Sequence, residues 1–439
     1  MGKTDTDDEA DVFIEPVAPP KSGGGLSGLW SRSRQLPRNV FAISLVSLLN
    51  DASSEIIYPL LPIFLSTTLG ASPGVVGLIE GAAESISSLL KLFAGYFSDR
   101  RGKRKGFVVF GYALSSFVRP LLAFAANWYQ VLGIRLTDRI GKGIRSAPRD
   151  AMIADTVRVE ERGLAFGFHR AMDHTGAVAG PLLGYLLVLL FAVDRNSPTA
   201  AEFKWIFLAA SVPALAAVAV AMFYVREVKH KRKADEDRIV KAPVKLSLKG
   251  FDSNFKRFLL IVALFTLSNS SDAFLLLRAR EAGVSVVLIP LLWATLHVSK
   301  VVSSIFGGDL SDRLGRRRLI ISGWILYAAV YAGFAFVTNE FSVWVLFIIY
   351  GIYFGFAEGA EKALVADLVP AEKRGTAFGL YNLAFGITVF PASLLMGALW
   401  DWRGPQIAFI VSAMLGSTAA LLLLLLVKTP TNAHHKVLG

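Results

Sequence analysis

Two stretches of this sequence repeat one another: Gly95-Tyr-Phe-Ser-Asp99-Arg-Arg-Gly102-Lys-Arg-Lys105 and Gly308-Asp-Leu-Ser-Asp312-Arg-Leu-Gly315-Arg-Arg-Arg318. Their aspartates lie 213 positions apart. A second pair begins with Ala154-Asp155 and Ala366-Asp367, continues into Arg162–Gly167 and Arg374–Gly379, and has an offset of 212. Two different motifs that recur at nearly one offset indicate that the chain is a duplicated unit.

The composition around these repeats is that of a membrane protein. Of the 439 residues, 54% are hydrophobic and 18% are charged, whereas soluble domains contain about 25% charged residues. The apolar residues form long runs with few charges, close to the ~20 residues that crossing a bilayer requires. The sequence contains no cysteine, which excludes disulfides, thiolate metal sites and cysteine nucleophiles.

Twelve such runs predict an all-α membrane protein with 12 transmembrane helices in two pseudo-symmetric six-helix halves. The runs are centred near Leu49, Ser88, Ala113, Ile134, Val178, Ala214, Leu264, Ser299, Leu326, Ile348, Ile387 and Leu421. The halves cover residues 38–226 and 256–428, and a charged cytoplasmic connector, 227–255, joins them. Residues 1–37 and 429–439 are predicted to be cytoplasmic tails, the first of them disordered because it is polar and rich in Pro and Gly.

Lysines and arginines gather beyond alternate ends of the predicted spans, as at Arg100 to Lys105, Lys229 to Lys233 and Arg313 to Arg318. The positive-inside rule places these clusters, and with them both termini, on the cytoplasmic side. We therefore expect a multi-pass protein of the cell (inner) membrane. This anchoring accounts for much of the net charge of +12, so no nucleic-acid partner is expected.

These motifs resemble those of the major facilitator superfamily from roughly Val40 to Val427. The family's loop signature, G-x-x-x-D-R-x-G-R-[KR]-[KR], occurs twice, and the first copy departs from it only by Lys103 in place of Arg. Gly176-x-x-x-Gly180-Pro181-x-x-Gly184 is similar to the family's antiporter signature in span five, and Pro59-x-x-Pro62 to a pattern of drug and proton antiporters in span one. The branch that the chain resembles most is that of 12-span drug and metabolite:proton antiporters.

The resemblance implies a secondary active transporter that moves a small organic solute by alternating access, as a proton-coupled exporter. It implies no cofactor, with the proton gradient as the energy source, no metal, and a monomer in the lipid bilayer. The cations of spans three and four favour an anionic or zwitterionic solute. Two alternatives stay open: a proton-coupled symporter that imports an organic anion or other metabolite, and a transport-dead sensor or scaffold. An enzyme is not expected, because no zinc spacing, Gly-x-Ser-x-Gly or phosphate-binding loop occurs.

The repeated loops are predicted to form a conformational latch. Asp99 and Asp312 can accept hydrogen bonds from the first amides of a neighbouring helix, and the basic residues that follow can hold carboxylates. Such a contact can exist in one global state and break in the other. The alternative is a topological anchor with no switching role. The latch residues are Gly95, Asp99, Arg100, Gly102, Arg104, Gly308, Asp312, Arg313, Gly315 and Arg316.

The glycines of span five recur every four residues, at Gly176, Gly180 and Gly184, and so share one helix face on which another backbone can approach closely. Pro181 removes one helix hydrogen bond among them. The resemblance implies that this face seals the first half against the second. The alternative is a general packing seam, but the equivalent segment of the second half lacks the glycine series.

Four ionisable residues inside the spans are candidates for proton coupling, since such residues are costly in a bilayer and usually serve a function. They are Asp51, Glu55, Glu84 and His297. His297 occupies the place in the repeat that corresponds to Glu84, and imidazole titrates near physiological pH. The alternatives are a hydrogen bond from Glu55 that caps the helix break before Pro59, and a packing role for His297.

Other polar and aromatic residues of the spans are candidates for binding the solute or lining its cavity. They are Tyr58, Glu80, Arg119, Arg135, Asp138, Arg139, Asp272, Trp293 and Lys300. The cations among them can neutralise an anionic solute or hold the carboxylates in place, and ion pairing within the bundle is the alternative role for most of them.

Overall fold

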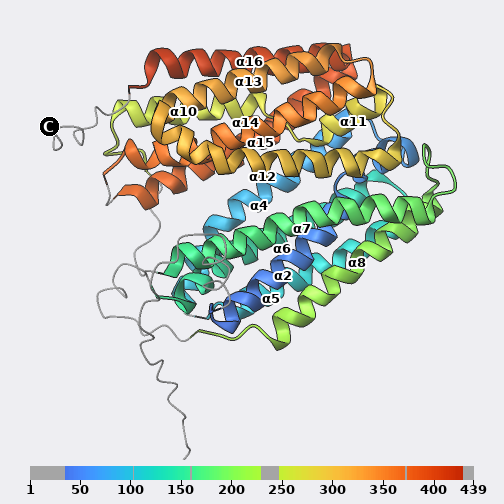
Figure 1. The fold of residues 1–439 in the computed structure, drawn as a ribbon, viewed down its shortest axis with the longest axis horizontal. Coiled ribbons are helices and arrows are strands. Elements are labelled where there is room, and N and C mark those ends of the chain that lie inside the picture. Colours follow the sequence, from blue (N-terminus) through green and yellow to red (C-terminus); the bar gives the residue numbers. More distant parts are fainter. Residues whose placement is uncertain (1–34, 102, 159–160, 229–246, 371–372, 429–439) are drawn as a thin grey trace, which may run out of the picture. The chain divides into compact units, whose positions relative to one another are not determined.

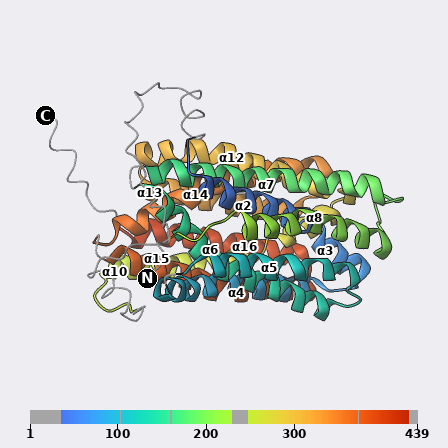
Figure 2. The ribbon, with the colours of Figure 1, turned by 90° about the horizontal axis from the view of Figure 1, so that it is seen from below.

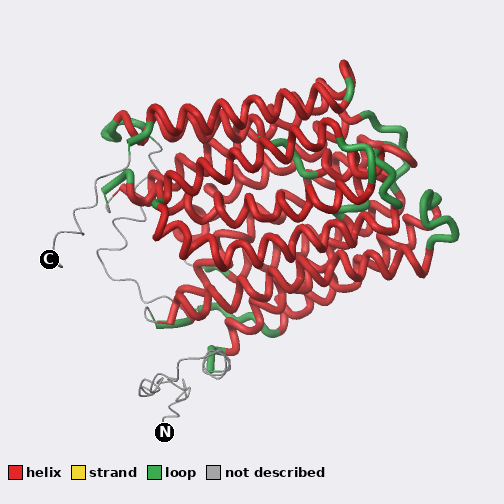
Figure 3. Tube along the Cα trace, turned by 45° about the horizontal axis from the view of Figure 1, so that its top comes forward, coloured by secondary structure: helices red, strands yellow, loops and turns green. Residues whose placement is uncertain are grey.

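The computed structural model describes residues 35–101, 103–158, 161–228, 247–370 and 373–428. In these ranges every regular element is a helix, as Figure 3 shows. The chain forms two units, Met1–Leu36 and Pro37–Gly439, and the second contains all the described helices. Nearly all of the two predicted tails and most of the predicted connector fall outside the described residues.

Six long helices form the first half, and two of them continue into short elements. In chain order the elements are α2 (Arg38–Ile57) with α3 (Leu61–Ile63) and the π-helical η1 (Phe64–Thr68), α4 (Pro73–Arg101), α5 (Lys105–Val118) with the 3₁₀ helix η2 (Arg119–Phe124), α6 (Trp128–Thr156), α7 (Arg162–Phe191) and α8 (Ala200–Phe223).

The second half repeats this plan. Its elements are α10 (Ser253–Ser268), α11 (Ala273–Glu281), the 3₁₀ helix η4 (Val286–Leu288) leading into α12 (Ile289–Leu314), α13 (Arg316–Phe336), α14 (Glu340–Asp367), α15 (Arg374–Arg403) and α16 (Pro405–Leu426). Each predicted span coincides with a different long helix, so the all-helical architecture with 12 spans is confirmed. In Figure 1 the helices of the first half are coloured from blue to green, and those of the second half from yellow to red.

Two of the spans differ in composition from the rest. In the described chain, ten helical spans are long and apolar enough to cross a bilayer by length and composition alone, and α4 and α6 are not among them. These two helices contain several carboxylates and basic residues, including Glu80 and Glu84 on α4 and Arg135 and Arg139 on α6. Charges at this depth need partners, so α4 and α6 depend on contacts with their neighbours.

The first and seventh spans are both interrupted. Helix α2 ends at Ile57, just before Pro59, whose missing amide hydrogen cannot continue the helical bonding. Helix α10 ends at Ser268, and α11 begins at Ala273. Both breaks leave non-helical backbone inside the protein, where other groups must satisfy its hydrogen bonds. At the second break, the hydroxyl of Tyr327 donates a hydrogen bond of 2.5 Å to the carbonyl of Ser268.

The two repeated sequence motifs bind one another within each half. Arg104, in the first loop motif, forms an ion pair with Asp155 at the end of α6. Arg316 pairs with Asp367 at the end of α14 in the same way, 212 positions later. The side chains of Asp99 and Asp312, and all of Gly102, lie outside the described residues. The basic part of each predicted latch thus joins α5 to α6 and α13 to α14.

We call the end of the bundle that contains these loops the basic end, and the opposite end the far end. The basic end lies at the left of Figure 1. The halves meet along α4 with α15 and along α7 with α12, which Figure 2 shows side by side. Between described residues, the hydrogen bonds that join α4 to α15 run from the far end, where Asp401 binds Gly74, only as far as Ser85 and Gly386 at mid-helix.

Small residues allow α4 and α15 to touch. A Cβ atom on Gly77 would overlap the backbone oxygen of Ser393, and one on Gly81 would lie 2.8 Å from the Ser393 Cβ. Both distances are shorter than van der Waals contact, so the backbones of the two helices are in direct contact here.

We predict that Gly77→Ala forces α4 and α15 apart and lowers the thermal unfolding temperature of the protein in detergent. Gly133→Ala is the matched control, because a Cβ on that helical glycine would meet no atom within 4 Å. Overpacking of a filled contact typically costs about 1–3 kcal/mol. Equal unfolding temperatures for the two variants would contradict the close contact.

Candidate functional site

A buried ion-pair network joins α4, α6 and the start of η2. Nε and Nη2 of Arg135 donate to the two carboxylate oxygens of Glu80 at 2.9 and 2.6 Å. Nε of Arg119 donates to Oδ1 of Asp138 at 3.0 Å, and Nη1 of Arg135 lies 3.6 Å from the other oxygen of Asp138. All four side chains are at most 6% exposed. Each charge in this group therefore has an opposite charge beside it.

Glycines bring the helices of the network together. A Cβ on Gly111 of α5 would lie 2.6 Å from the backbone oxygen of Gly141 on α6, and a Cβ on Gly143 would lie 2.6 Å from the Cβ of Leu90 on α4. The backbone of α6 is thus close to both neighbouring helices. This proximity lets short hydrogen bonds form between their charged side chains.

The network differs from an open binding surface. The sequence predicts Glu80, Arg119, Arg135 and Asp138 as residues that bind the solute or line its cavity. In this structure they are enclosed and bind one another, which is the geometry of ion pairing within the bundle. Removal of one member would leave a buried charge without a partner.

Toward the basic end the contacts become looser. Nη1 of Arg139 lies 3.9 Å from Oε2 of Glu84, and the buried Nε of Arg139 makes no hydrogen bond. Lys142 lies one turn further along α6 and is partly buried. Among the described side chains no carboxylate lies within 4 Å of Lys142, although Glu84 and Glu55 are within its electrostatic range. These groups are less tightly paired than those of the network.

A second group connects the two halves, and we call its four residues, Glu55, Tyr58, Trp293 and His297, the Glu55 cluster. Oε2 of Glu55 on α2 accepts a hydrogen bond of 2.7 Å from the indole nitrogen of Trp293 on α12, and it lies 3.7 Å from Nε2 of His297. The rings of Tyr58 and Trp293 have centroids 5.0 Å apart. Sequence analysis singled out all four residues, and the structure brings them together.

The Glu55 carboxylate is not used as a cap. At the break before Pro59 the backbone amide of Tyr58 donates to the carbonyl of Ser54 at 2.9 Å, and the carboxylate faces α12 instead. Glu55 is 22% exposed and His297 is 14% exposed. His297 Nε2 makes no hydrogen bond. This carboxylate and this imidazole therefore face one another across the two halves without a hydrogen bond.

The glycine face of α7 sets the position of α2. Cβ atoms on Gly176 and Gly180 would each lie 2.6 Å from a backbone oxygen of α2, and the one on Gly180 would lie 2.8 Å from the Cβ of Glu55. Gly184 reaches the other half, where Pro290 would be 3.6 Å away. The resemblance implies a seal between the halves, whereas Gly176 and Gly180 pack within the first half. Pro181 lies buried in the same helix.

The remaining candidates have separate partners. Asp51 accepts a hydrogen bond of 3.0 Å from the side chain of the preceding asparagine. Asp272, at the break between α10 and α11, accepts one of 2.7 Å from the hydroxyl of Tyr350. Nζ of Lys300 lies 3.6 Å from the ring centroid of Phe354. None of these three contacts crosses between the halves.

Sequence reasoning did not find Asp401. Its Oδ2 accepts hydrogen bonds from the hydroxyl of Ser72 at 2.8 Å and from the backbone nitrogen of Gly74 at 3.0 Å. A charged residue near the end of a span is ordinary in a sequence, and its partners are 329 and 327 positions away.

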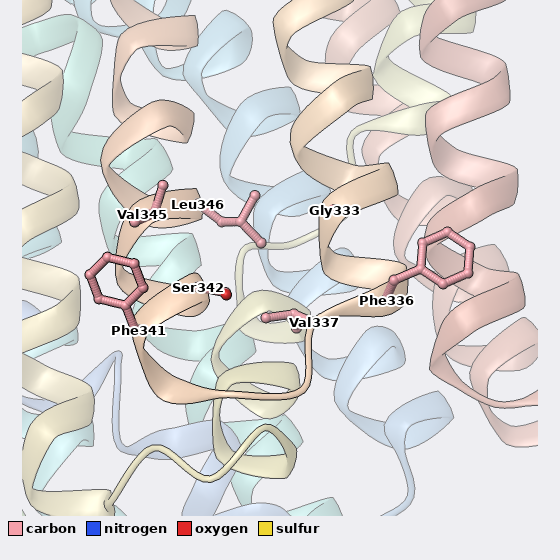
Figure 4. A pocket seen from close by; sticks show the side chains of 7 residues that line it. All are labelled: Gly333, Phe336, Val337, Phe341, Ser342, Val345 and Leu346. Atoms are coloured by element: carbon pink, nitrogen blue, oxygen red, sulfur yellow. The ribbon is translucent and has the colours of Figure 1, made fainter.

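The described chain also has a pocket outside this site. A pocket of about 340 Å³ between the end of α13 and the start of α14 is lined by Gly333, Phe336, Val337, Phe341, Ser342, Val345 and Leu346 (Figure 4). It is mostly apolar and lies at the far end. No group of three His, Cys, Asp or Glu residues that could hold a metal ion occurs among the described residues.

Comparison with known proteins gives consistent results. The family model described as Major Facilitator Superfamily matches residues 43–297 and 258–438. An uncharacterized MFS-type transporter of Methanocaldococcus jannaschii is 36% identical over 397 residues, which are 89% of this chain and 95% of that protein. The multi-drug resistance efflux pump PmrA homolog of Lactococcus lactis is 25% identical, over 86% of this chain and 92% of its own. The crystal structure of a D-xylose-proton symporter shares the fold, with a TM-score of 0.72, 16% identity and coverage of 89% and 98%.

We predict that Glu80→Gln lowers the stability of the protein by up to about 3–5 kcal/mol, because the buried Arg135 loses its bidentate partner and keeps only the 3.6 Å contact with Asp138, which Arg119 also binds. Thermal unfolding in detergent measures this loss. The double variant Glu80→Gln/Arg135→Gln should be more stable than Glu80→Gln alone, since it removes the excess buried cation and leaves Asp138 paired with Arg119. A double variant less stable than both single variants would show that the ion pair is not the cause.

Proposed function

This chain belongs to the major facilitator superfamily, and we propose that it is a proton-coupled exporter of a small organic solute. Its family and fold are those of membrane-embedded transporters, and the curated relatives include efflux pumps. The direction of transport and the coupling to protons are our proposal. The observation that supports it most is the contact of Glu55 with Trp293 and His297 across the two halves.

Glu55 fits the chemistry of a proton-coupling residue. As a carboxylate it accepts the hydrogen bond from Trp293 and attracts a protonated His297. Protonation of Glu55 would remove the negative charge and weaken both contacts. Because the contacts join α2 to α12, the charge on Glu55 changes the free energy of one arrangement of the halves relative to the other.

We propose that this contact keeps the empty protein from reorienting. A proton breaks the contact by neutralising Glu55, and a solute breaks it by occupying the groups around the Glu55 cluster. Either ligand then permits the halves to change their arrangement. Such a rule produces exchange of proton for solute, because reorientation with neither bound is disfavoured.

The arrangement of contacts suggests which side is open. We propose that the basic end faces the cytoplasm, as its arginines and lysines favour. The described hydrogen bonds between α4 and α15 run from the far end to mid-helix. The structure then corresponds to the state that is accessible from the cytoplasm, in which an exporter takes up its solute.

Two observations favour export over import. Gly180 fits against the Cβ of Glu55, so the antiporter-type glycine face directly adjoins the proposed proton-binding residue. An efflux pump is among the relatives that match nearly the whole chain.

Spin labels can test the coupling, since the chain has no native cysteine. We choose two pairs at repeat-related positions: Gly163→Cys with Gly375→Cys at the basic end, and Tyr129→Cys with Phe341→Cys at the far end. Both glycines have open space around them, and Tyr129 and Phe341 are 61% and 77% exposed. Between pH 8 and pH 5 we expect the ratio of the two states to change about tenfold, which corresponds to ~1.4 kcal/mol.

In this experiment Glu55→Gln should hold the distances at their low-pH distribution at every pH. The matched control is Glu358→Gln, which removes a carboxylate paired with Lys362 of its own helix and should leave the pH response unchanged. A full pH response in Glu55→Gln would exclude Glu55 as the coupling group.

Transport into inside-out membrane vesicles tests the direction. With a ligand found by thermal-shift screening of the purified protein, an exporter that exchanges protons should concentrate the ligand in vesicles whose interior is acid. Dissipation of the pH gradient with an ionophore should abolish the accumulation. A proton symporter would instead deplete the acid vesicles of ligand, and that result would overturn the proposal.

A further inference from the structure

Hydrogen bonds between the halves hold the far end of the protein closed, and the repeat relates the donors of two of them. At the start of α4, the backbone nitrogen of Gly74 donates to Oδ2 of Asp401, which lies near the end of α15 in the other half. At η4, before α12, the backbone nitrogen of Val287 donates to the carbonyl of Arg195 in the loop after α7, at 3.2 Å. Gly74 and Val287 are 213 positions apart, which is the offset of the loop motifs.

The donors of the two contacts are equivalent in position, but the acceptors differ in both place and chemistry. In each contact, an oxygen atom of one half accepts a hydrogen bond from a backbone amide of the other half. The amide of Gly74 lies at the start of the second span, and that of Val287 at the start of the eighth. The first amides of a helix have no partner within it, and they carry a partial positive charge. For Gly74 the acceptor is a carboxylate, whereas for Val287 it is a neutral carbonyl. Charge-assisted hydrogen bonds are the stronger kind.

The local packing is fitted to Asp401. A Cβ atom on Gly74 would overlap the carboxylate of Asp401, and one on Gly397 would lie 2.8 Å from the Cα of Gly74. The hydroxyl of Ser72 donates a second hydrogen bond to the same carboxylate oxygen at 2.8 Å. Two donors and Gly74 thus adjoin one exposed carboxylate, and Gly397 lets α15 approach the start of α4 closely.

We propose that Asp401 is a gating residue of the transport cycle: its carboxylate caps α4 and locks the far end, and this contact must break before that end can open. The lock acts on the arrangement of the halves and so applies to either direction of transport. It lies apart from the Glu55 cluster, and it is independent of proton coupling.

The test uses the full chain with spin labels at Tyr129→Cys and Phe341→Cys, reconstituted in lipid nanodiscs at fixed pH. Asp401→Ala should increase the ratio of far-end-open to far-end-closed protein about fivefold, the factor expected from the loss of a typical helix cap. Glu281→Gln is the matched control, because this far-end carboxylate binds Arg278 within its own half, and its ratio should equal that of the parent chain.

A double-mutant cycle separates a lock from a general effect on folding. Ser72→Ala should open the far end in the parent chain but have no effect in Asp401→Ala, since the hydroxyl then has no carboxylate to bind. Equal effects of Ser72→Ala in both backgrounds, or an unchanged ratio in Asp401→Ala, would overturn the proposal.

The outcome can be distinguished from that for the proposed exporter. If Asp401→Ala opens the far end while Glu55→Gln leaves the pH response intact, the lock stands and the coupling proposal fails. If Glu55→Gln removes the pH response and Asp401→Ala changes nothing, the coupling stands and the lock fails.

Discussion

The pairing of charges inside the bilayer is the constraint on which the rest of this structure depends. Helices α4 and α6 are too polar to count as membrane spans by composition, yet both cross the bundle. They can do so because Arg135 binds Glu80 and Arg119 binds Asp138 in an enclosed group. A fully paired network of this kind resists deformation, since separating any member exposes a charge to the apolar interior. The first half is therefore suited to move as one body.

Duplication explains much of the remaining order, and the departures from it show where the halves have different tasks. The ion pairs of Arg104 with Asp155 and of Arg316 with Asp367 join the same two motifs in each half, although the arginines stand one place apart in the loop motif. In contrast, the place of Glu84 is taken by His297, which faces Glu55 across the interface. One half thus supplies a carboxylate, and the other an imidazole and an indole, to the contact across the interface.

The sequence was sufficient to predict what depends on local pattern. Twelve apolar runs, the loop motifs and their offset determine the number of helices and the two halves, and ionisable residues in spans mark Glu55 and His297 as unusual. Contacts between distant segments were less predictable. The bond from Trp293 to Glu55 and that from Gly74 to Asp401 join residues 238 and 327 positions apart. Likewise, a span's charge pattern does not reveal whether Arg119 is paired or open to a solute.

The contact at Ser85 and Gly386 has a mechanical consequence. Helix α4 touches α15 from its first turn to the middle of the bundle, and the smallest residues lie along that line. About 24 Å of α4 continues beyond Ser85 toward the basic end, given a rise of 1.5 Å per residue. The line of contact can then serve as a fulcrum and the rest of the helix as its lever arm. A tilt too small to disturb the packing at the fulcrum would carry the basic loop through several times that displacement.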